Sequence, residues 1–242
     1  MAMVYSWEVA VVTLLVLIFT LVIVKFVFFG RRKGLYVCLL GYSDAGKTLL
    51  FTRLAHDRFV KTQSSIKENK ATLQIKNKKS VELVDIPGNE RIRDRLFGKY
   101  RDNIRAIIVV VDSANIQAEV RNVAELLFDL LSSRSINKQL SSILVACNKQ
   151  DLTLAKECEA VQAMLEKEIT ALRITREAKP ASMDGGASNS SPLFLGKQDK
   201  DFQFSDLAIK VQFVPCSARG KGEETSSVAE VDTVKTWIMN LP

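Results

Sequence analysis

The feature that most constrains this chain is an eight-residue loop, Gly41-Tyr42-Ser43-Asp44-Ala45-Gly46-Lys47-Thr48. The apolar run 35–40 before it is typical of a buried strand, and the apolar residues of 49–54 after it stand at helical spacing. Such a loop binds phosphate, because its backbone N–H groups close around the anion and glycine lets the chain turn tightly. Lys47 would add a positive charge, Thr48 a hydroxyl for Mg²⁺, and the helix N-terminus a favourable dipole. The sequence therefore predicts a nucleotide phosphate site at residues 41–48.

Two later segments predict that the base is guanine. Asn148-Lys149-Gln150-Asp151 follows the apolar run 143–147. The carboxylate of Asp151 can accept hydrogen bonds from both N1–H and the exocyclic amine of guanine, whereas adenine offers no such pair of donors. The last predicted strand, 209–214, leads to Ser217 and Ala218, where a backbone N–H can contact the base oxygen.

A third group of residues predicts contacts to the γ-phosphate and to Mg²⁺. Asp85 follows the strand 81–84 and would reach the metal through water, and Gly88 would offer its N–H to the γ-phosphate. In the polar segment 61–70, one hydroxyl should reach Mg²⁺ when GTP is bound. Ser65 is favoured for this role, and Thr62 and Ser64 are left open. A loop held by that contact would be ordered by GTP and released after hydrolysis.

The residue after Gly88 predicts slow catalysis. Many GTPases have glutamine there to orient the attacking water, whereas this chain has Asn89, one methylene shorter. We therefore predict a GTP-binding protein with slow intrinsic hydrolysis, and leave open whether it acts as an enzyme. The basic cluster 91–101 that follows is interpreted either as a solvated helix face or as a partner surface.

The N-terminal apolar run predicts a transmembrane helix. Residues 9–29 contain one charge, Lys25, and would span about 31 Å as a helix, which matches the hydrocarbon core. A signal peptide normally has its positive charges before the apolar run, but here Arg31, Arg32 and Lys33 follow it. The expected order is a short lumenal N-terminus at 1–8, the span at 9–29, a basic linker at 30–34 and a cytosolic domain at 35–242.

Amino-acid composition bears on the state of the cysteines, on binding partners and on disorder. The four cysteines lie in apolar segments without a C-x-x-C pair, which favours buried reduced thiols over a metal site or disulfides. The net charge of +7 is compatible with an anionic membrane or an RNA-rich partner and identifies neither. Residues 177–201 are rich in polar residues and glycine, so we expect a disordered insertion there, of unassigned role.

The motifs between Gly41 and Arg219 resemble those of Ras-superfamily GTPases of the Arf and Sar branch. With the N-terminal run and the late insertion, the chain resembles the family of signal recognition particle receptor β subunits. The resemblance implies an α/β P-loop GTPase fold: a mostly parallel six-stranded sheet with helices on both faces, preceded by one transmembrane helix. It implies GTP and Mg²⁺ as ligands. By resemblance, residues 41–48 hold phosphate and Mg²⁺, Asp85 and Gly88 sense the γ-phosphate, and guanine is held by Asn148, Lys149, Asp151, Ser217 and Ala218. The chain departs from the wider family at Asn89, where glutamine is usual, and at Ser64 and Ser65, where a threonine is typical.

The same resemblance implies the partners and the location. The GTP-bound form would dock the receptor α subunit as a heterodimer at the endoplasmic reticulum membrane, for cotranslational targeting, and would meet the signal recognition particle and the ribosome only indirectly. Direct sequence-specific binding to nucleic acid is not expected. Two alternatives are left open: a membrane-anchored Arf/Sar-like GTPase that recruits vesicle-trafficking effectors, and a structural membrane protein whose nucleotide never exchanges.

Overall fold

The computed structural model describes residues 7, 9–20, 35–62, 65–76, 80–177, 194–198, 200–221 and 228–241. The chain divides into two units, Met1–Lys33 and Gly34–Pro242. Each unit is described by itself.

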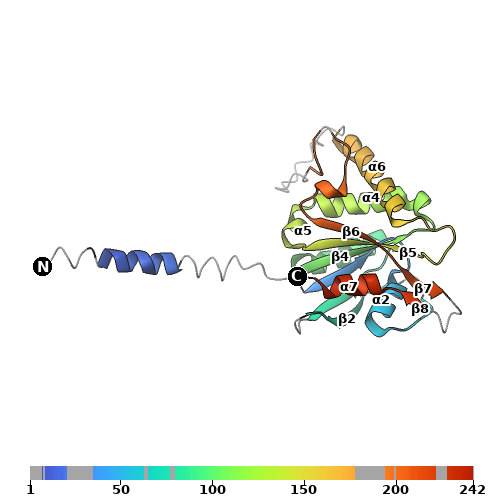
Figure 1. Cartoon of the computed structure of the whole chain (residues 1–242), viewed down its shortest axis with the longest axis horizontal. Helices are drawn as coiled ribbons and strands as arrows, with labels where there is room; N and C mark the ends of the chain where they lie inside the picture. Colours follow the sequence, from blue (N-terminus) through green and yellow to red (C-terminus); the bar gives the residue numbers. More distant parts are fainter. Residues whose placement is uncertain are drawn as a thin grey trace. The chain divides into compact units, whose positions relative to one another are not determined.

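In the first unit, residues 9–20 form a helix with exposed apolar side chains (Figure 1). Among the residues that the structure describes, no helix is both long and apolar enough to cross a membrane. The transmembrane helix in the predicted fold class is therefore wrong for the described part of 9–29. Residues 21–34, which include the predicted linker, lie outside the described residues, as do 1–6 and 8.

The second unit is built on a six-stranded sheet of order β2-β3-β1-β4-β5-β6. Five strands run parallel: β1 (Tyr36–Leu40), β3 (Ser80–Asp85), β4 (Ile104–Asp112), β5 (Ser142–Asn148) and β6 (Lys210–Pro215). The edge strand β2 (Asn69–Gln74) pairs antiparallel with β3. The sheet is therefore mixed, with one antiparallel edge strand.

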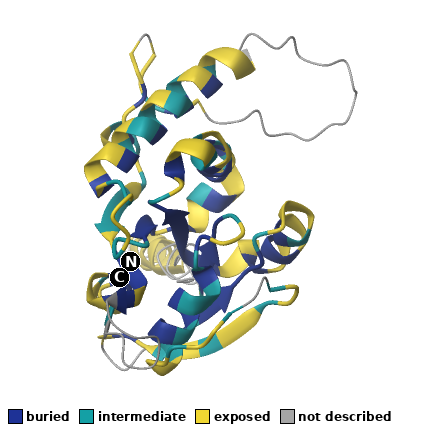
Figure 2. Cartoon of the chain, turned by 90° about the vertical axis from the view of Figure 1, so that its right-hand side faces the viewer, coloured by how far each residue is buried: buried dark blue, intermediate teal, exposed yellow. Residues whose placement is uncertain are grey.

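Helices cover both faces of the sheet. One core cluster packs under α3 (Glu90–Tyr100), α4 (Ile116–Ser132), α5 (Arg134–Gln139) and α6 (Cys158–Glu177). The other packs under α2 (Lys47–His56) and α7 (Asp232–Met239). A small hairpin, β7 (Ser217–Lys221) with β8 (Val228–Glu230), and two 3₁₀ turns, Arg101–Asn103 and Phe204–Asp206, complete the unit. Figure 2 shows the buried strands in the middle of the domain and the exposed outer sides of the helices.

Strand β4 explains why the core has two halves. All nine of its residues are buried, and successive side chains point to opposite faces of the sheet. Ile107, Val109 and Val111 belong to the cluster under α3 to α6, whereas Ile108 and Val110 belong to the cluster under α2 and α7. Parallel strands buried on both faces place their carboxyl ends at one edge, where the predicted motifs lie.

Part of the predicted insertion packs against the domain. Glu177 is the last residue of α6, and Leu195 is buried together with Phe202 and Phe204 beyond the insertion. Arg173 of α6 donates hydrogen bonds to the backbone oxygens of Lys197 and Lys200, both at 3.1 Å. Disorder over 177–201 stays a prediction, of which residues 177, 194–198, 200 and 201 are described. Residues 178–193 and 199 lie outside the described residues.

Candidate functional site

The loop 41–48 has the backbone that its glycines permit. Gly41 and Gly46 have φ angles of 142° and 86°, in the region that side chains rarely adopt. A Cβ on Gly41 would collide with the carbonyl oxygen of Val110 in β4, so the loop can lie against the neighbouring strand only with glycine there. Gly46 then leads directly into α2, whose first turn contains no acidic residue. The N-terminus of α2 is thus free to face an anion.

Lys47 is the first residue of α2, and its side chain reaches back to the loop. Its side chain is buried, and its Nζ donates a hydrogen bond to the backbone oxygen of Tyr42 at 2.5 Å. Burial lowers the pKa of Lys47 to about 8, although Asp85 and Asp44 act in the opposite direction. A nearby phosphate would favour the charged amine, so the arrangement suits an anionic ligand.

The structure brings together the three residues that were predicted to bind Mg²⁺, namely Thr48, Ser65 and Asp85. The Thr48 hydroxyl donates to Oδ2 of Asp85 at 2.9 Å, and the Ser65 hydroxyl lies 3.0 Å from Thr48 Oγ1. Asn69 of β2 also donates to Oδ2 of Asp85, at 3.0 Å. The other carboxylate oxygen, Oδ1, is buried and has no hydrogen-bond partner among the described residues. Two hydroxyls and a carboxylate with a free oxygen are the hard oxygen donors that Mg²⁺ prefers, so this cluster fits the metal.

A cavity of about 350 Å³ joins the phosphate loop to the two segments predicted to sense the γ-phosphate. Its wall is formed by residues of the loop, by Thr62 and Ser65, and by Gly88 and Asn89. A Cβ on Gly88 would collide with the backbone of Tyr42 and Ser43, so glycine is needed for this close approach. Ser64, the third candidate hydroxyl, lies outside the described residues.

The guanine motifs converge at the ends of β5 and β6. Buried Asn148 donates from Nδ2 to the backbone oxygen of Ala45 at 2.8 Å and accepts the N–H of Ala218 at 3.0 Å. Ser217 donates to Asp151 Oδ1 at 2.5 Å and accepts the N–H of Gly220 at 2.8 Å. Asn148 thus ties the phosphate loop to the start of β7, and Asp151 is held beside the same strand.

Lys149 is positioned by a residue that the sequence analysis missed. Its Nζ donates to Oδ2 of Asp112 at 2.6 Å, and its backbone has a φ of 66°. The other oxygen of Asp112 accepts the N–H groups of Ala114 and Asn115 at 3.0 and 3.2 Å. Because Asp112 ends β4 beside Asn148 of β5, an acidic residue at the end of the neighbouring strand was the available signal.

Arg53 of α2 is a second residue that the sequence did not reveal. Its Nε donates to the backbone oxygen of Ala218 at 3.1 Å, and its Nη2 to that of Arg219 at 3.4 Å. The guanidinium also lies over the ring of Phe59, 5.5 Å from its centre. An arginine in an amphipathic helix gives no sequence signal for such a contact, because its partners lie more than 160 positions away.

Asn89 has a structural contact at the rim of the cavity. It is the N-cap of α3, and its Oδ1 accepts the N–H of Ile92 at 3.4 Å. The side chain is exposed, so its predicted role in orienting water stays a prediction. In the basic cluster after it, Arg93 is buried over the ring of Tyr42 at 5.2 Å and pairs with Asp94 at 3.4 Å. Arg93 is therefore part of the packing and not of a solvated face.

The four cysteines are free and buried, in agreement with the predicted reduced thiols. Burial raises the pKa values of Cys38 and Cys216 to about 12, so neither is a thiolate at neutral pH. No group of three or more histidine, cysteine, aspartate or glutamate side chains that could hold a metal ion was found within the described ranges.

Known proteins resemble this chain over most of its length. The family described as Signal recognition particle receptor beta subunit matches residues 33–211. The signal recognition particle receptor subunit beta of Mus musculus is 40% identical over 232 residues, covering 95% of this chain and 85% of the relative. The Homo sapiens protein of that name is 40% identical over 233 residues, with coverages of 96% and 85%. A structure of the mammalian SRP receptor aligns with a TM-score of 0.70 and 37% identity, covering 86% of this chain and 100% of that chain.

Proposed function

Because this chain belongs to the family of signal recognition particle receptor β subunits, we propose that it is the guanine nucleotide-binding subunit of that receptor and acts in protein targeting. In this proposal its GTP-bound form docks the receptor α subunit. The family relationship covers most of the chain, and the 37% identity to a mammalian receptor structure extends over 86% of it.

The observation that carries the nucleotide proposal is the convergence of four separate motifs at one edge of the sheet. Lys47 and Thr48 follow β1, Asp85 ends β3, Asn148 ends β5, and Ser217 follows β6. Each of these residues except Lys47 forms a hydrogen bond to a residue from another motif, such as Asn148 to Ala45 and Ser217 to Asp151. These contacts support a preformed site for the phosphates at one end and guanine at the other.

Mg²⁺ would be held by the hydroxyls of Thr48 and Ser65 and by Asp85, through water. When bound, the metal neutralises charge on the phosphates. Asn69 holds Oδ2 of Asp85 and leaves Oδ1 without a partner in the described residues, which supports a role in orienting that carboxylate. Burial raises the pKa of Asp85, and a cation at this position would favour its charged form.

Slow hydrolysis follows from the residue at 89. Asn89 is the N-cap of α3, so its amide oxygen is engaged by the backbone of the same helix. A side chain that is short and partly committed to a cap is poorly suited to orient water. The GTP state would therefore persist until another protein stimulates hydrolysis, which suits a subunit that holds its partner while GTP is bound.

The location follows from family membership alone. We place the proposed action at the endoplasmic reticulum membrane, with the nucleotide domain in the cytosol.

Residues 65–66 and the residues just before α3 border the phosphate cavity, so a partner that contacts them would sense the γ-phosphate. The signal recognition particle and the ribosome would be reached through the α subunit.

Affinity capture of the full chain tests this function. Wild type and Thr48→Asn, each solubilised in detergent, are used to capture binding proteins, and the retained proteins are identified. Asparagine removes the hydroxyl expected on Mg²⁺ and should weaken the GTP state. We expect the α subunit with wild type and less of it with the variant.

Other outcomes would replace the proposal. Vesicle coat or tethering factors in place of the α subunit would favour the Arf-like alternative. Equal capture of the α subunit by both proteins would mean that the nucleotide is structural and does not control docking.

A further inference from the structure

A cavity of about 440 Å³, the β6 cavity, lies between the edge strand β6 and helix α7. Its wall includes Ser142 and Lys210, the paired first residues of β5 and β6. The cavity therefore reaches the amino ends of these parallel strands, whereas the guanine motifs follow their carboxyl ends. None of the residues predicted to bind the nucleotide is among the described residues that line it. The β6 cavity is thus separate from the nucleotide site.

Two side-chain amides in the wall of the β6 cavity have their oxygens engaged by the protein. Gln212 accepts the indole N–H of Trp237 at 2.9 Å, and Asn240 accepts Nζ of Lys76 at 2.5 Å. An indole N–H and an ammonium group can only donate, so each amide must turn its oxygen towards them. Neither amide nitrogen donates to a described residue. Each amide therefore leaves an NH₂ group for a ligand in the cavity.

Lys210 adds a positive charge to the same wall. It is exposed at the start of β6 and has no hydrogen bond or ion pair to another described residue. Its side chain lies on the same face of β6 as that of Gln212, two residues further on. No acidic residue is among the described residues that line the β6 cavity. An ammonium group and two amide nitrogens are thus left without acceptors from the described domain.

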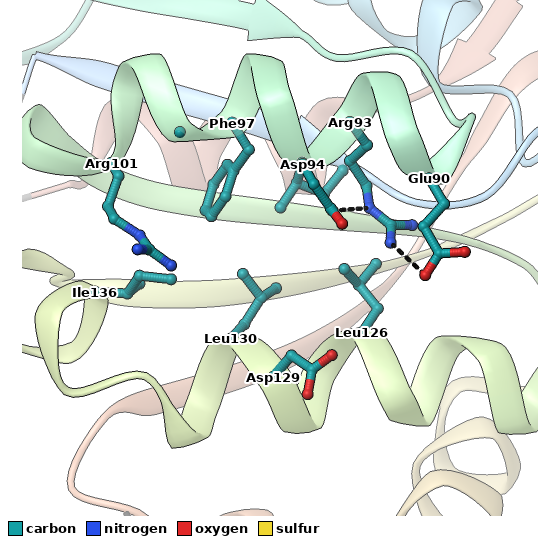
Figure 3. A pocket seen from close by; sticks show the side chains of 11 residues that line it. Glu90, Arg93, Asp94, Phe97, Arg101, Leu126, Asp129, Leu130 and Ile136 are labelled. Carbon is teal, nitrogen blue, oxygen red and sulfur yellow. Dashed lines mark hydrogen bonds and ion pairs between the residues drawn. The ribbon is translucent and has the colours of Figure 1, made fainter. Parts of the chain in front are cut away.

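The cavity of about 350 Å³ between α3 and α4 has a different chemistry (Figure 3). Glu90, Asp94 and Asp129 line it. Glu90 and Asp94 pair with Arg93 at 3.9 and 3.4 Å, and Asp129 pairs with Arg176 at 2.7 Å. Its carboxylates therefore face cations of the same domain. The β6 cavity instead offers unmatched donors, so it fits a ligand that is rich in acceptors and carries negative charge.

The remaining wall of the β6 cavity suits a ring with hydroxyl groups. The indole of Trp237 is held by Gln212 and offers an apolar face, beside Leu241. The exposed hydroxyls of Ser141 and Thr236 can donate to or accept from hydroxyl groups of a ligand. About 440 Å³ exceeds the space that one phosphate group needs and lies in the range of small-molecule sites, about 300–1,000 Å³.

We propose that the β6 cavity binds a phosphorylated polyol. Its phosphate accepts hydrogen bonds from Lys210, Gln212 and Asn240, and its ring lies against Trp237. Two sources present this chemistry: the headgroup of an inositol phospholipid, and a free inositol or sugar phosphate. This inference goes beyond the proposed function and does not depend on it.

Tryptophan fluorescence measures binding in this cavity directly. The chain contains two tryptophans, Trp7 and Trp237, so Trp7→Phe leaves only the indole of the β6 cavity. The full chain with Trp7→Phe, in detergent with GTP and Mg²⁺, is titrated with inositol 1-phosphate. We expect a saturable change in the emission of Trp237. Inositol without phosphate, at the same concentrations, should cause no change.

Two variants of this Trp7→Phe chain test the donors. Lys210→Gln removes the charge and should weaken binding of inositol 1-phosphate about tenfold. Gln212→Glu keeps an oxygen that accepts the indole N–H but replaces the NH₂ group by a negatively charged oxygen, so binding should weaken by at least about 30-fold. The matched control is Lys138→Gln, which removes an exposed lysine of α5 that does not line the cavity. The control should bind as the parent does, and all three variants should bind GTP with unchanged affinity.

Vesicles distinguish the two sources of the ligand. The same chains are mixed with vesicles of phosphatidylcholine, with and without phosphatidylinositol. If the source is a lipid, phosphatidylinositol vesicles change the emission of Trp237 at lower headgroup concentrations than inositol 1-phosphate does, and Gln212→Glu abolishes the difference between the two kinds of vesicle. If the source is a free phosphorylated polyol, inositol 1-phosphate changes the emission and the two kinds of vesicle act alike.

Three results would overturn the inference. The first is no change in the emission of Trp237 with either inositol 1-phosphate or phosphatidylinositol vesicles. The second is an equal response to inositol without phosphate. The third is unchanged binding in both Lys210→Gln and Gln212→Glu. None of these measurements involves the α subunit, so the proposed function would stand in each case.

Discussion

The ion pair between Asp112 and Lys149 allows the sharpest test of how the base is recognised. Lys149 directly follows β5, and its side chain reaches Asp112 at the end of β4. The Nζ of Lys149 lies 2.6 Å from Oδ2 of Asp112. The backbone N–H groups of Ala114 and Asn115 fix the other oxygen of Asp112. Asp112→Asn preserves the shape of the side chain and removes the charge, so we expect Lys149 to lose its fixed position and guanine nucleotides to bind more weakly.

The expected loss follows from the geometry and the exposure of the pair. A hydrogen bond between charged groups contributes about 1.5–3 kcal/mol when well shielded from water. The Lys149 and Asp112 side chains are 30% and 11% exposed, so screening by solvent lowers this to about 1–2 kcal/mol. Since about 1.4 kcal/mol corresponds to a factor of ten, the affinity for GTP should fall about 5- to 30-fold.

A double-mutant cycle distinguishes positioning from a general loss of stability. Dissociation constants for GTP are measured at fixed Mg²⁺ for wild type, Asp112→Asn, Lys149→Ala and the double variant. If Asp112 acts through Lys149, the double variant binds no more weakly than Lys149→Ala alone. Asp129→Asn, which disrupts an exposed ion pair between α4 and Arg176 of α6, should bind as wild type does. Additive losses in the double variant would refute the reasoning.

Three further predictions concern the same site. Asp151→Asn should lower affinity for GTP about 100-fold by removing two charged hydrogen bonds, and should raise affinity for XTP. Competition between GTP and XTP measures both changes, and an unchanged preference for GTP over XTP would contradict the guanine assignment. The pKa of Lys47 is lowered to about 8 in the free protein, and bound phosphate would keep the amine charged, so affinity for GTP should fall about tenfold per pH unit above pH 8. Dissociation constants that do not change with pH would exclude this coupling between protonation of Lys47 and binding of GTP. Asn89→Gln should lower the free energy of unfolding by about 1 kcal/mol through loss of the helix cap, yet speed single-turnover hydrolysis of GTP. An unchanged rate of hydrolysis would mean that residue 89 does not orient the attacking water.

Much of the site was predictable because its residues lie at the ends of parallel strands. An apolar run followed by polar residues identifies such an end, and the carboxyl ends of neighbouring parallel strands meet at one edge of a sheet. Gly41 to Thr48, Asp85 and Asn148 are brought together for this reason. Ser65 could be chosen from three hydroxyls only by its position before Ile66, and it lies beside Thr48.

Other contacts depend on packing that no local pattern encodes. Arg53 and Ala218 are 165 positions apart, and Asn69 reaches Asp85 only because β2 pairs antiparallel with β3. The transmembrane helix predicted at 9–29 is wrong for the described residues, among which no helix is long and apolar enough to cross a membrane. Composition also gave no signal that Leu195, near the end of the expected insertion, would be buried.

The central claim is that GTP controls docking of the receptor α subunit. Its most direct test is the affinity of the α subunit for one preparation of the full chain loaded in turn with a non-hydrolysable GTP analogue or with GDP, both with Mg²⁺. We predict at least tenfold tighter binding to the GTP-analogue form. Equal affinity for the two forms would contradict the claim and leave the nucleotide with a purely structural role.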